Sequence, residues 1–94
     1  MLRLRTARAR LLERALAEGF VKKGNHEIKV HKEMVTFYFR DTPITMWDMI
    51  HGTVTQDSHG YDTISTTDNQ RKNAEAVAEY RKARVAELCS QQSS

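Results

Sequence analysis

Histidine and aspartate side chains gather in two neighbouring predicted turns, where they are placed to hold a divalent cation. The four residues fall within twelve positions and are His51, Asp57, His59 and Asp62. Zinc sites use recurring ligand spacings, such as paired histidines on one helix face, and this spacing matches none of them. Local hydrogen bonds within the turns are the ordinary role of such residues. The sequence therefore predicts no metal ion and no other cofactor.

The hydroxyl and thiol groups show no pattern typical of a catalytic nucleophile. Cys89 lies near the end of a predicted helix, where the negative end of the helix dipole disfavours a reactive thiolate. No serine lies in a Gly-x-Ser-x-Gly turn, and the four glycines are isolated, so the sequence has no phosphate-binding glycine loop. A single cysteine cannot form an internal disulfide, which favours a reducing compartment. We expect a non-enzymatic protein of the cytoplasm.

A ladder of hydroxyl groups precedes the second helical pattern, between Ser58 and Thr67. The segment also contains Gly60, which we expect to adopt positive φ in a turn, and the ring of Tyr61. It is too polar to be core and too organised to be a linker, so it is where we expect a partner to bind. The predicted partner-binding residues are Tyr61, Asp62, Thr63, Ser65, Thr66 and Arg71.

Basic residues form a second candidate surface. On a helical wheel Arg3, Arg10 and Arg14 form one stripe, and Arg71 and Lys72 follow the start of the second helical pattern. Such residues could contact the phosphates of a nucleic acid. Acidic residues interleave with them, so solvated helix and hairpin faces are the alternative interpretation. The formal net charge of +3 permits an anionic partner without requiring one.

The elements that must position these residues are two helices and a set of strands between them. Apolar residues recur at helical spacing over residues 6–18 and again over 68–88. Alternation of apolar and polar residues predicts strands over residues 26–31, 34–40, 44–49 and 53–56. The predicted fold is α+β, in the order α-β-β-β(-β)-α, an antiparallel meander with two helices packed on one face. At 94 residues and 39% hydrophobic composition the chain suits one domain, 1–94, with a frayed tail over 89–94.

Local signals predict how the two helices begin and end. Gly19 is placed to be the left-handed residue that ends the first helix, with Phe20 making the apolar contact that accompanies such an end. Thr67 and Gln70 have the spacing of a capping box at the start of the second helix. Arg8 falls within the apolar stripe of the first helix. Either that helix begins after Thr6, or the Arg8 stem lies along the core with its charge outside.

The second helical pattern is longer than the predicted sheet. About 21 residues span roughly 32 Å, whereas strands of five or six residues span ~17–20 Å. Val85 and Leu88 lie on one face of the part that must extend beyond the sheet. Exposed apolar residues tend to be covered, so these two predict a homodimer contact. No apolar run is long enough to span a membrane, so we expect no membrane partner.

The order helix–three strands–helix resembles a double-stranded-RNA-binding domain. The second helix opens with residues 70–78, which read Gln-Arg-Lys-Asn-Ala-Glu-Ala-Val-Ala. That family begins its second helix with a basic cluster followed by alanines, and the cluster contacts phosphates across a groove. The resemblance implies this role for Arg71 and Lys72.

The chain also resembles small uncharacterised bacteriophage proteins. These carry a Thr-Pro-Ile strand start, a Gly-aromatic-x-Thr turn with a Thr-Thr pair, and Arg-x-Asn in a helix. The matching segments here are residues 42–44, 60–63, 66–67 and 71–73. Many such proteins bind and block a host defence or enzyme complex. The resemblance implies a binding protein, in its most concrete form an anti-CRISPR-like inhibitor, that inhibits or redirects a host protein or ribonucleoprotein complex in the cytoplasm of a bacterial cell. The alternative is a small RNA- or DNA-binding module.

Overall fold

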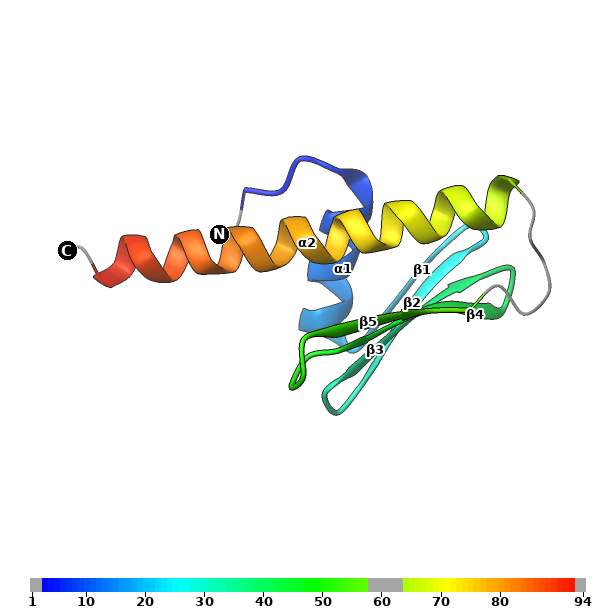
Figure 1. The fold of residues 1–94 in the computed structure, drawn as a ribbon, viewed down its shortest axis with the longest axis horizontal. Helices are drawn as coiled ribbons and strands as arrows, with labels where there is room; N and C mark the ends of the chain where they lie inside the picture. Colours follow the sequence, from blue (N-terminus) through cyan, green and yellow to red (C-terminus); the bar gives the residue numbers. More distant parts are fainter. Residues whose placement is uncertain (1–2, 58–63, 93–94) are drawn as a thin grey trace.

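Two helices cover one face of a five-stranded antiparallel sheet (Figure 1). The structure is a computed structural model and describes residues 3–57 and 64–92. Along the chain the elements are α1 (Ala7–Glu18), β1 (Phe20–Lys23), β2 (His26–His31), β3 (Met34–Phe39), β4 (Thr42–Asp48), β5 (Thr53–Gln56) and α2 (Ile64–Gln92). The strands pair in chain order, β1-β2-β3-β4-β5. The predicted α+β class, the meander and the helix on each side of it in the chain are confirmed.

The core lies between the sheet and the helices. α1 packs on β1 and β2, α2 packs on β4 and β3, and the helices also contact each other. Val35 and Phe37 of β3 point toward the helices in the predicted alternation, and Trp47 of β4 is buried beside them. The members of the main buried cluster are Leu12, Ala15, Val21, Ile28, Val35, Phe37, Trp47 and Val77.

α1 begins one residue later than predicted and ends before Gly19 as its local sequence predicts. Thr6 is the N-cap, and its side chain accepts a hydrogen bond from the backbone N–H of Ala9. Gly19 is left-handed, with φ of 88°, and its N–H donates to the carbonyl of Ala15. The contact predicted for Phe20 is wrong, because Phe20 opens β1 and is 47% exposed.

Three strand predictions need correction. The residues of β1 lay outside the predicted strands, but Lys22 and Lys23 pair with β2, and only Val21 of this strand points into the core. β3 ends one residue early, because Arg40 and Asp41 form its turn with φ of 51° and 64°. Positive φ at both central residues suits the twist of a two-residue hairpin.

β4 starts two residues before the strand predicted over residues 44–49. It begins at Thr42 and includes Pro43, which lies opposite Tyr38 at a register shift in β3. A β-bulge is one of the few places in a sheet where proline is tolerated. β4 then ends at Asp48 rather than Met49, because Asp48 opens the following turn by accepting hydrogen bonds from the N–H groups of Ile50 and His51.

α2 is longer than predicted at both ends. It begins at Ile64, so Thr67 lies inside the helix and the capping box predicted from Thr67 and Gln70 is wrong. It continues to Gln92, through most of the predicted tail. Its 29 residues span about 43 Å, so the C-terminal part extends beyond the sheet as predicted (Figure 1).

Candidate functional site

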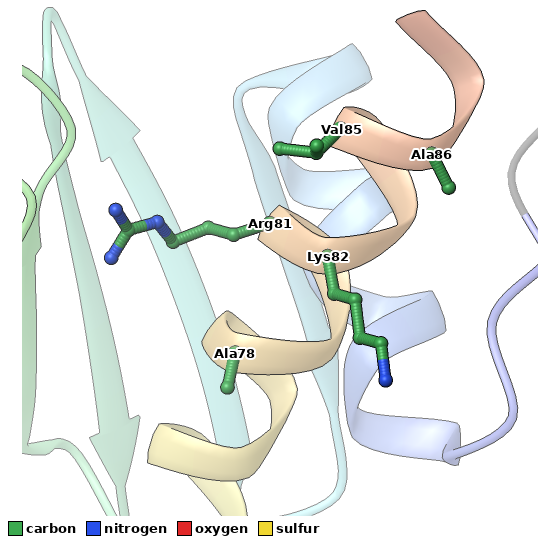
Figure 2. A pocket seen from close by; sticks show the side chains of 5 residues that line it. All are labelled: Ala78, Arg81, Lys82, Val85 and Ala86. Atoms are coloured by element: carbon green, nitrogen blue, oxygen red, sulfur yellow. The ribbon is translucent and has the colours of Figure 1, made fainter. Parts of the chain in front are cut away.

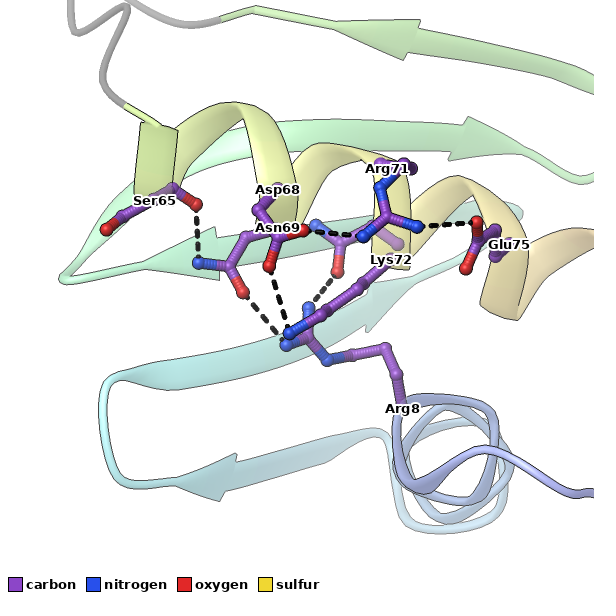
Figure 3. Close-up of polar contacts among 8 residues, drawn as sticks. Arg8, Ser65, Asp68, Asn69, Arg71, Lys72 and Glu75 are labelled. Atoms are coloured by element: carbon purple, nitrogen blue, oxygen red, sulfur yellow. Dashed lines mark hydrogen bonds and ion pairs between the residues drawn. The ribbon is translucent and has the colours of Figure 1, made fainter.

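Arg8 of α1 reaches across to α2 and binds two asparagine side chains (Figure 3). Its Nη1 donates to Oδ1 of Asn73, and its Nη2 donates to Oδ1 of Asn69 at 3.0 Å. Both asparagines are buried and Arg8 is partly buried. Burial lowers the pKa of the guanidinium, and the nearby Asp68 carboxylate opposes this shift. Arg8 therefore lays its stem along the core as one alternative predicted, but its charged end is partly buried against α2 rather than outside. The other alternative also holds, because α1 begins at Ala7, after Thr6.

The same contacts continue into the sheet. Nδ2 of Asn73 donates to the hydroxyl of Thr45 at 3.0 Å, and that hydroxyl donates to Oε1 of Gln56. Nε2 of Gln56 donates to the carbonyl of Gln70 at 2.9 Å, so the chain of hydrogen bonds returns to α2. Thr45 is completely buried. The network joins α1, α2, β4 and β5, and it fixes the orientation of the Arg8 guanidinium.

A cleft of about 430 Å³ lies beside Arg8, between α1, the β1–β2 hairpin and the first half of α2. Its lining contains four cationic side chains and one imidazole but only one carboxylate among the described residues. These residues are Arg8, Lys23, His26, Arg71, Lys72 and Glu75. We call this site the basic cleft. The ring of His26 stacks on Phe39, with ring centres 5.4 Å apart.

Two carboxylates on α2 partly balance the basic cleft. Arg71 bonds to Asp68 at 2.6 Å and to Glu75 at 3.0 Å, and Lys72 pairs with Asp68 at 3.0 Å (Figure 3). The hydrogen bond from Arg71, followed by that from Lys72, lowers the pKa of Asp68. The pKa of His26 is also lowered, first by burial and then by the charges of Arg8 and Lys72. His26 is therefore a neutral hydrogen-bonding group at neutral pH.

The predicted partner-binding residues divide into three groups. Tyr61, Asp62 and Thr63, like Gly60, lie outside the described residues. Ser65 and Thr66 form part of the first turn of α2 rather than a preceding loop, and Thr66 is buried rather than presented on the surface. Arg71 is exposed and lines the basic cleft.

The predicted nucleic-acid residues do not form one continuous surface. Arg10 donates from Nε to the carbonyl of Leu4 at 3.1 Å and from Nη2 to that of Arg5 at 3.0 Å, so it holds the segment before α1. Nε of Arg14 lies 3.7 Å from Oε2 of Glu18, and Arg3 is exposed in the segment before α1. Arg71 and Lys72 lie in the basic cleft with Arg8, whereas Arg3, Arg10 and Arg14 do not line it.

Of the histidine and aspartate residues in the predicted turns, His51 makes a local contact with Asp48. Nδ1 of His51 lies 2.7 Å from Oδ2 of Asp48, and this hydrogen bond is the main cause of the lowered pKa of Asp48. His59 and Asp62 lie outside the described residues. Over residues 3–57 and 64–92, no three His, Cys, Asp or Glu side chains are grouped so that they could hold a metal ion.

The C-terminal half of α2 presents apolar side chains at a distance from the basic cleft. Val85 is 60% exposed and Leu88 49% exposed. Ala78, Arg81, Lys82, Val85 and Ala86 line an open depression of about 530 Å³ (Figure 2). Arg81 points away from α2 and donates from Nη1 to the carbonyl of Gly52 at 3.3 Å, beside the β4–β5 turn. The apolar face that Val85 and Leu88 predicted is therefore accessible in the single chain.

No family model, curated protein or solved structure matches this chain. In the part of the chain that the structure describes, neither helix is both long and apolar enough to cross a membrane. The basic cleft and the exposed end of α2 are the two surfaces from which a function can be argued.

Four of the six residues that define the basic cleft were absent from the predicted binding sets, namely Arg8, Lys23, His26 and Glu75. The position of Arg8 could have indicated a polar site, because a cation within an apolar helical stripe needs either solvent or a polar partner for its charged end. Lys23 and His26 carried no such indication, since they join the cleft only through the pairing of β1 with β2.

Proposed function

We propose that this protein is a small non-enzymatic binding protein that docks the C-terminal half of α2 on a larger assembly. The observation that supports this proposal is the exposure of Val85 and Leu88 on a segment that extends beyond the sheet (Figure 1). Isolated exposed apolar residues are ordinary, but two on successive turns of an unpartnered helix face are typical of a helix that binds in a groove.

The charges around this face define the chemistry of the partner. Arg81, Lys82 and Arg84 flank the apolar residues and are all exposed, while Glu87 is the single acidic residue of segment 81–88. A complementary surface has an apolar centre and an acidic rim. In a two-fold homodimer the same cations of both copies would approach each other, which disfavours self-association. We therefore infer a heterologous partner, and the phage-type resemblance makes a host protein or ribonucleoprotein complex its proposed identity.

The proposal is tested by quantitative capture from a lysate of the source cell, followed by a binding titration with the captured assembly. The test variant is Val85→Asp with Leu88→Asp. We expect it to keep the melting temperature of the wild type and to lose more than about 2 kcal/mol of binding free energy, as central interface residues do. Ile64→Asp is the matched control, because Ile64 is 90% exposed at the opposite end of the same helix.

Three outcomes would contradict the proposal. Equal binding by the double variant and the wild type would remove the exposed end of α2 as the docking surface. Loss of binding in Ile64→Asp alone would place the contact at the start of α2. Sedimentation of a wild-type dimer that the double variant abolishes would show that a second copy covers Val85 and Leu88.

A further inference from the structure

The basic cleft has the charge, shape and preorganised donors of an anion site. We propose that Arg8, Lys23, His26 and Lys72 bind a phosphate group there. This inference does not depend on the function proposed for the other end of α2, because the two surfaces share no residue.

Arg8 is the central observation. Buried or partly buried cations are normally paired with a carboxylate, because an unpaired charge is poorly solvated. Within the described part of the chain, the hydrogen-bond acceptors of Arg8 are instead the neutral amide oxygens of Asn69 and Asn73. These amides hold the guanidinium in place without neutralising it. A guanidinium has five N–H donors, so further donors remain for a ligand, and its planar geometry suits two oxygens of one phosphate.

The charge balance of the cleft also favours an anion. Arg8, Lys23, Arg71 and Lys72 contribute four positive charges, and Glu75 together with the neighbouring Asp68 contributes two negative charges. Arg71 pairs with both carboxylates and Lys72 pairs with Asp68, whereas Arg8 is affected by the charge of Asp68 but donates its hydrogen bonds to neutral amides. Arg8 and Lys23 are therefore the cations of the cleft without a direct carboxylate partner among the ion pairs of the described residues. A phosphate monoester carries a charge of about −1.5 to −2 at neutral pH, which matches this excess.

The remaining lining groups suit the rest of such a ligand. His26 is held by its stack on Phe39 and offers a ring nitrogen as a neutral donor. The volume of about 430 Å³ is larger than one phosphate and lies in the ordinary range for small-molecule sites. The expected ligand is therefore a phosphate on a carrier. That carrier is either a free small molecule such as a nucleoside monophosphate or a nucleic-acid strand.

The test is an NMR titration of the full chain with four probes at fixed ionic strength. They are adenosine 5′-monophosphate, adenosine, inorganic phosphate and an eight-nucleotide single strand without a terminal phosphate. We expect the signals of the His26 ring and the Arg8 side chain to shift and saturate with a phosphate-bearing probe and not with adenosine. If only the monophosphate or inorganic phosphate saturates these signals, the ligand is a free phosphate compound. Saturation by the strand identifies a backbone phosphate.

Variants separate the cleft from general charge attraction. Lys23→Ala with Lys72→Ala should weaken binding at least tenfold, and Lys23→Arg with Lys72→Arg should retain it. Lys22→Ala with Lys32→Ala removes the same charge at exposed positions that do not line the cleft and should leave binding unchanged. The proposal is overturned if no phosphate-bearing probe saturates these signals, or if both alanine pairs weaken binding equally. Because Lys23 and Lys72 are exposed, the result does not depend on variants that disturb the buried asparagines.

Discussion

The two halves of α2 have opposite relationships with the rest of the chain, although one continuous helix contains both. In the first half, Asn69, Asn73, Ala76 and Val77 are buried against α1 and the sheet. In the second half, the face with Val85 and Leu88 is exposed, while Arg81 donates a hydrogen bond to Gly52 of the β4–β5 turn and Ala83 packs against the cluster of Leu4, Ala9 and Ala76. The first half therefore stabilises the fold, whereas the second half is free to bind a partner.

The residue types of the two halves follow the same division. The helix opens with Ile, Ser, Thr, Thr, Asp and Asn at 64–69, all of modest or poor helix propensity. Packing supports this turn, because Thr66 and Asn69 are buried. Segment 81–88 is mostly exposed and consists mostly of Arg, Lys, Ala, Glu and Leu, which favour helix intrinsically. Tertiary packing therefore stabilises the helical conformation of the first half of α2, and intrinsic helix propensity stabilises that of segment 81–88.

The largest effect is expected at the centre of the buried network. Asn73→Leu keeps a side chain of similar size but removes the acceptor of Arg8 and the donor to Thr45. Leaving buried polar groups without partners should lower the free energy of unfolding by about 3 kcal/mol. Urea denaturation measures this change. Arg84→Ala in the exposed half is the control and should change stability by less than about 0.5 kcal/mol. Equal losses in both variants would contradict the division of α2.

One substitution made in both halves sharpens the comparison. Val77 is 2% exposed and Val85 is 60% exposed on the same helix. Val77→Ala should lower the free energy of unfolding by about 2 kcal/mol, because it removes buried methyl groups and leaves a cavity. Val85→Ala should be within about 0.5 kcal/mol of the wild type, since alanine also favours the helix. Thermal melts of the two variants measure the difference, and a destabilised Val85→Ala would place that residue in the monomer core.

Much of the fold could be predicted because several local sequence patterns are each compatible with only one type of secondary structure. The alternation of β3 and the Lys32–Glu33 turn define the central hairpin, and Gly19 ends α1 in the left-handed region. β1 could not be predicted, because its four residues include two lysines and only one inward side chain, which is too little alternation to indicate a strand. It is a strand because it pairs with β2, and this pairing cannot be read from its own residues. The start of α2 was predicted too late because Thr67 and Gln70 have the spacing of a capping box. In the structure, burial of Thr66 and Asn69 stabilises an additional helical turn before that position.

The candidate site was less predictable for a related reason. The residues of the basic cleft come from three separate parts of the chain, namely α1, the β1–β2 hairpin and α2, and the spacing between Arg8, His26 and Lys72 carries no information about their proximity. The anomaly of a cation within an apolar stripe was visible at Arg8. Its partners were not, because Asn69 and Asn73 lie in the region where the sequence indicated a cap and a basic cluster.

The smallest effect is expected where the middle of α2 anchors the start of α1. The carboxylate of Glu79 accepts hydrogen bonds from the N–H groups of Arg5 and Thr6 and from the Thr6 hydroxyl. A negative charge at this end of α1 also complements the helix dipole. Glu79→Gln should lower the free energy of unfolding at pH 7 by about 1 kcal/mol, since the site is partly exposed and screened. Glu75→Gln is the matched control on the solvent side and should change it by less than about 0.5 kcal/mol.

The pH dependence of the stability difference between the wild type and Glu79→Gln shows whether Glu79 stabilises the start of α1 through its charge or through packing. The backbone hydrogen bond from Arg5 is the main cause that lowers the pKa of Glu79 below its ordinary value of 4.5, with the contacts from Thr6 adding to it. A depressed pKa in the folded state means that this stabilisation is complete above pH 4.5 and is lost as the pH falls through the lower, folded-state value. The difference between wild type and Glu79→Gln should therefore be constant from pH 7 to about pH 5 and should shrink toward pH 3. Urea denaturation across this range measures it. A difference that stays constant down to pH 3 would show that Glu79 acts through its shape and not through its charge.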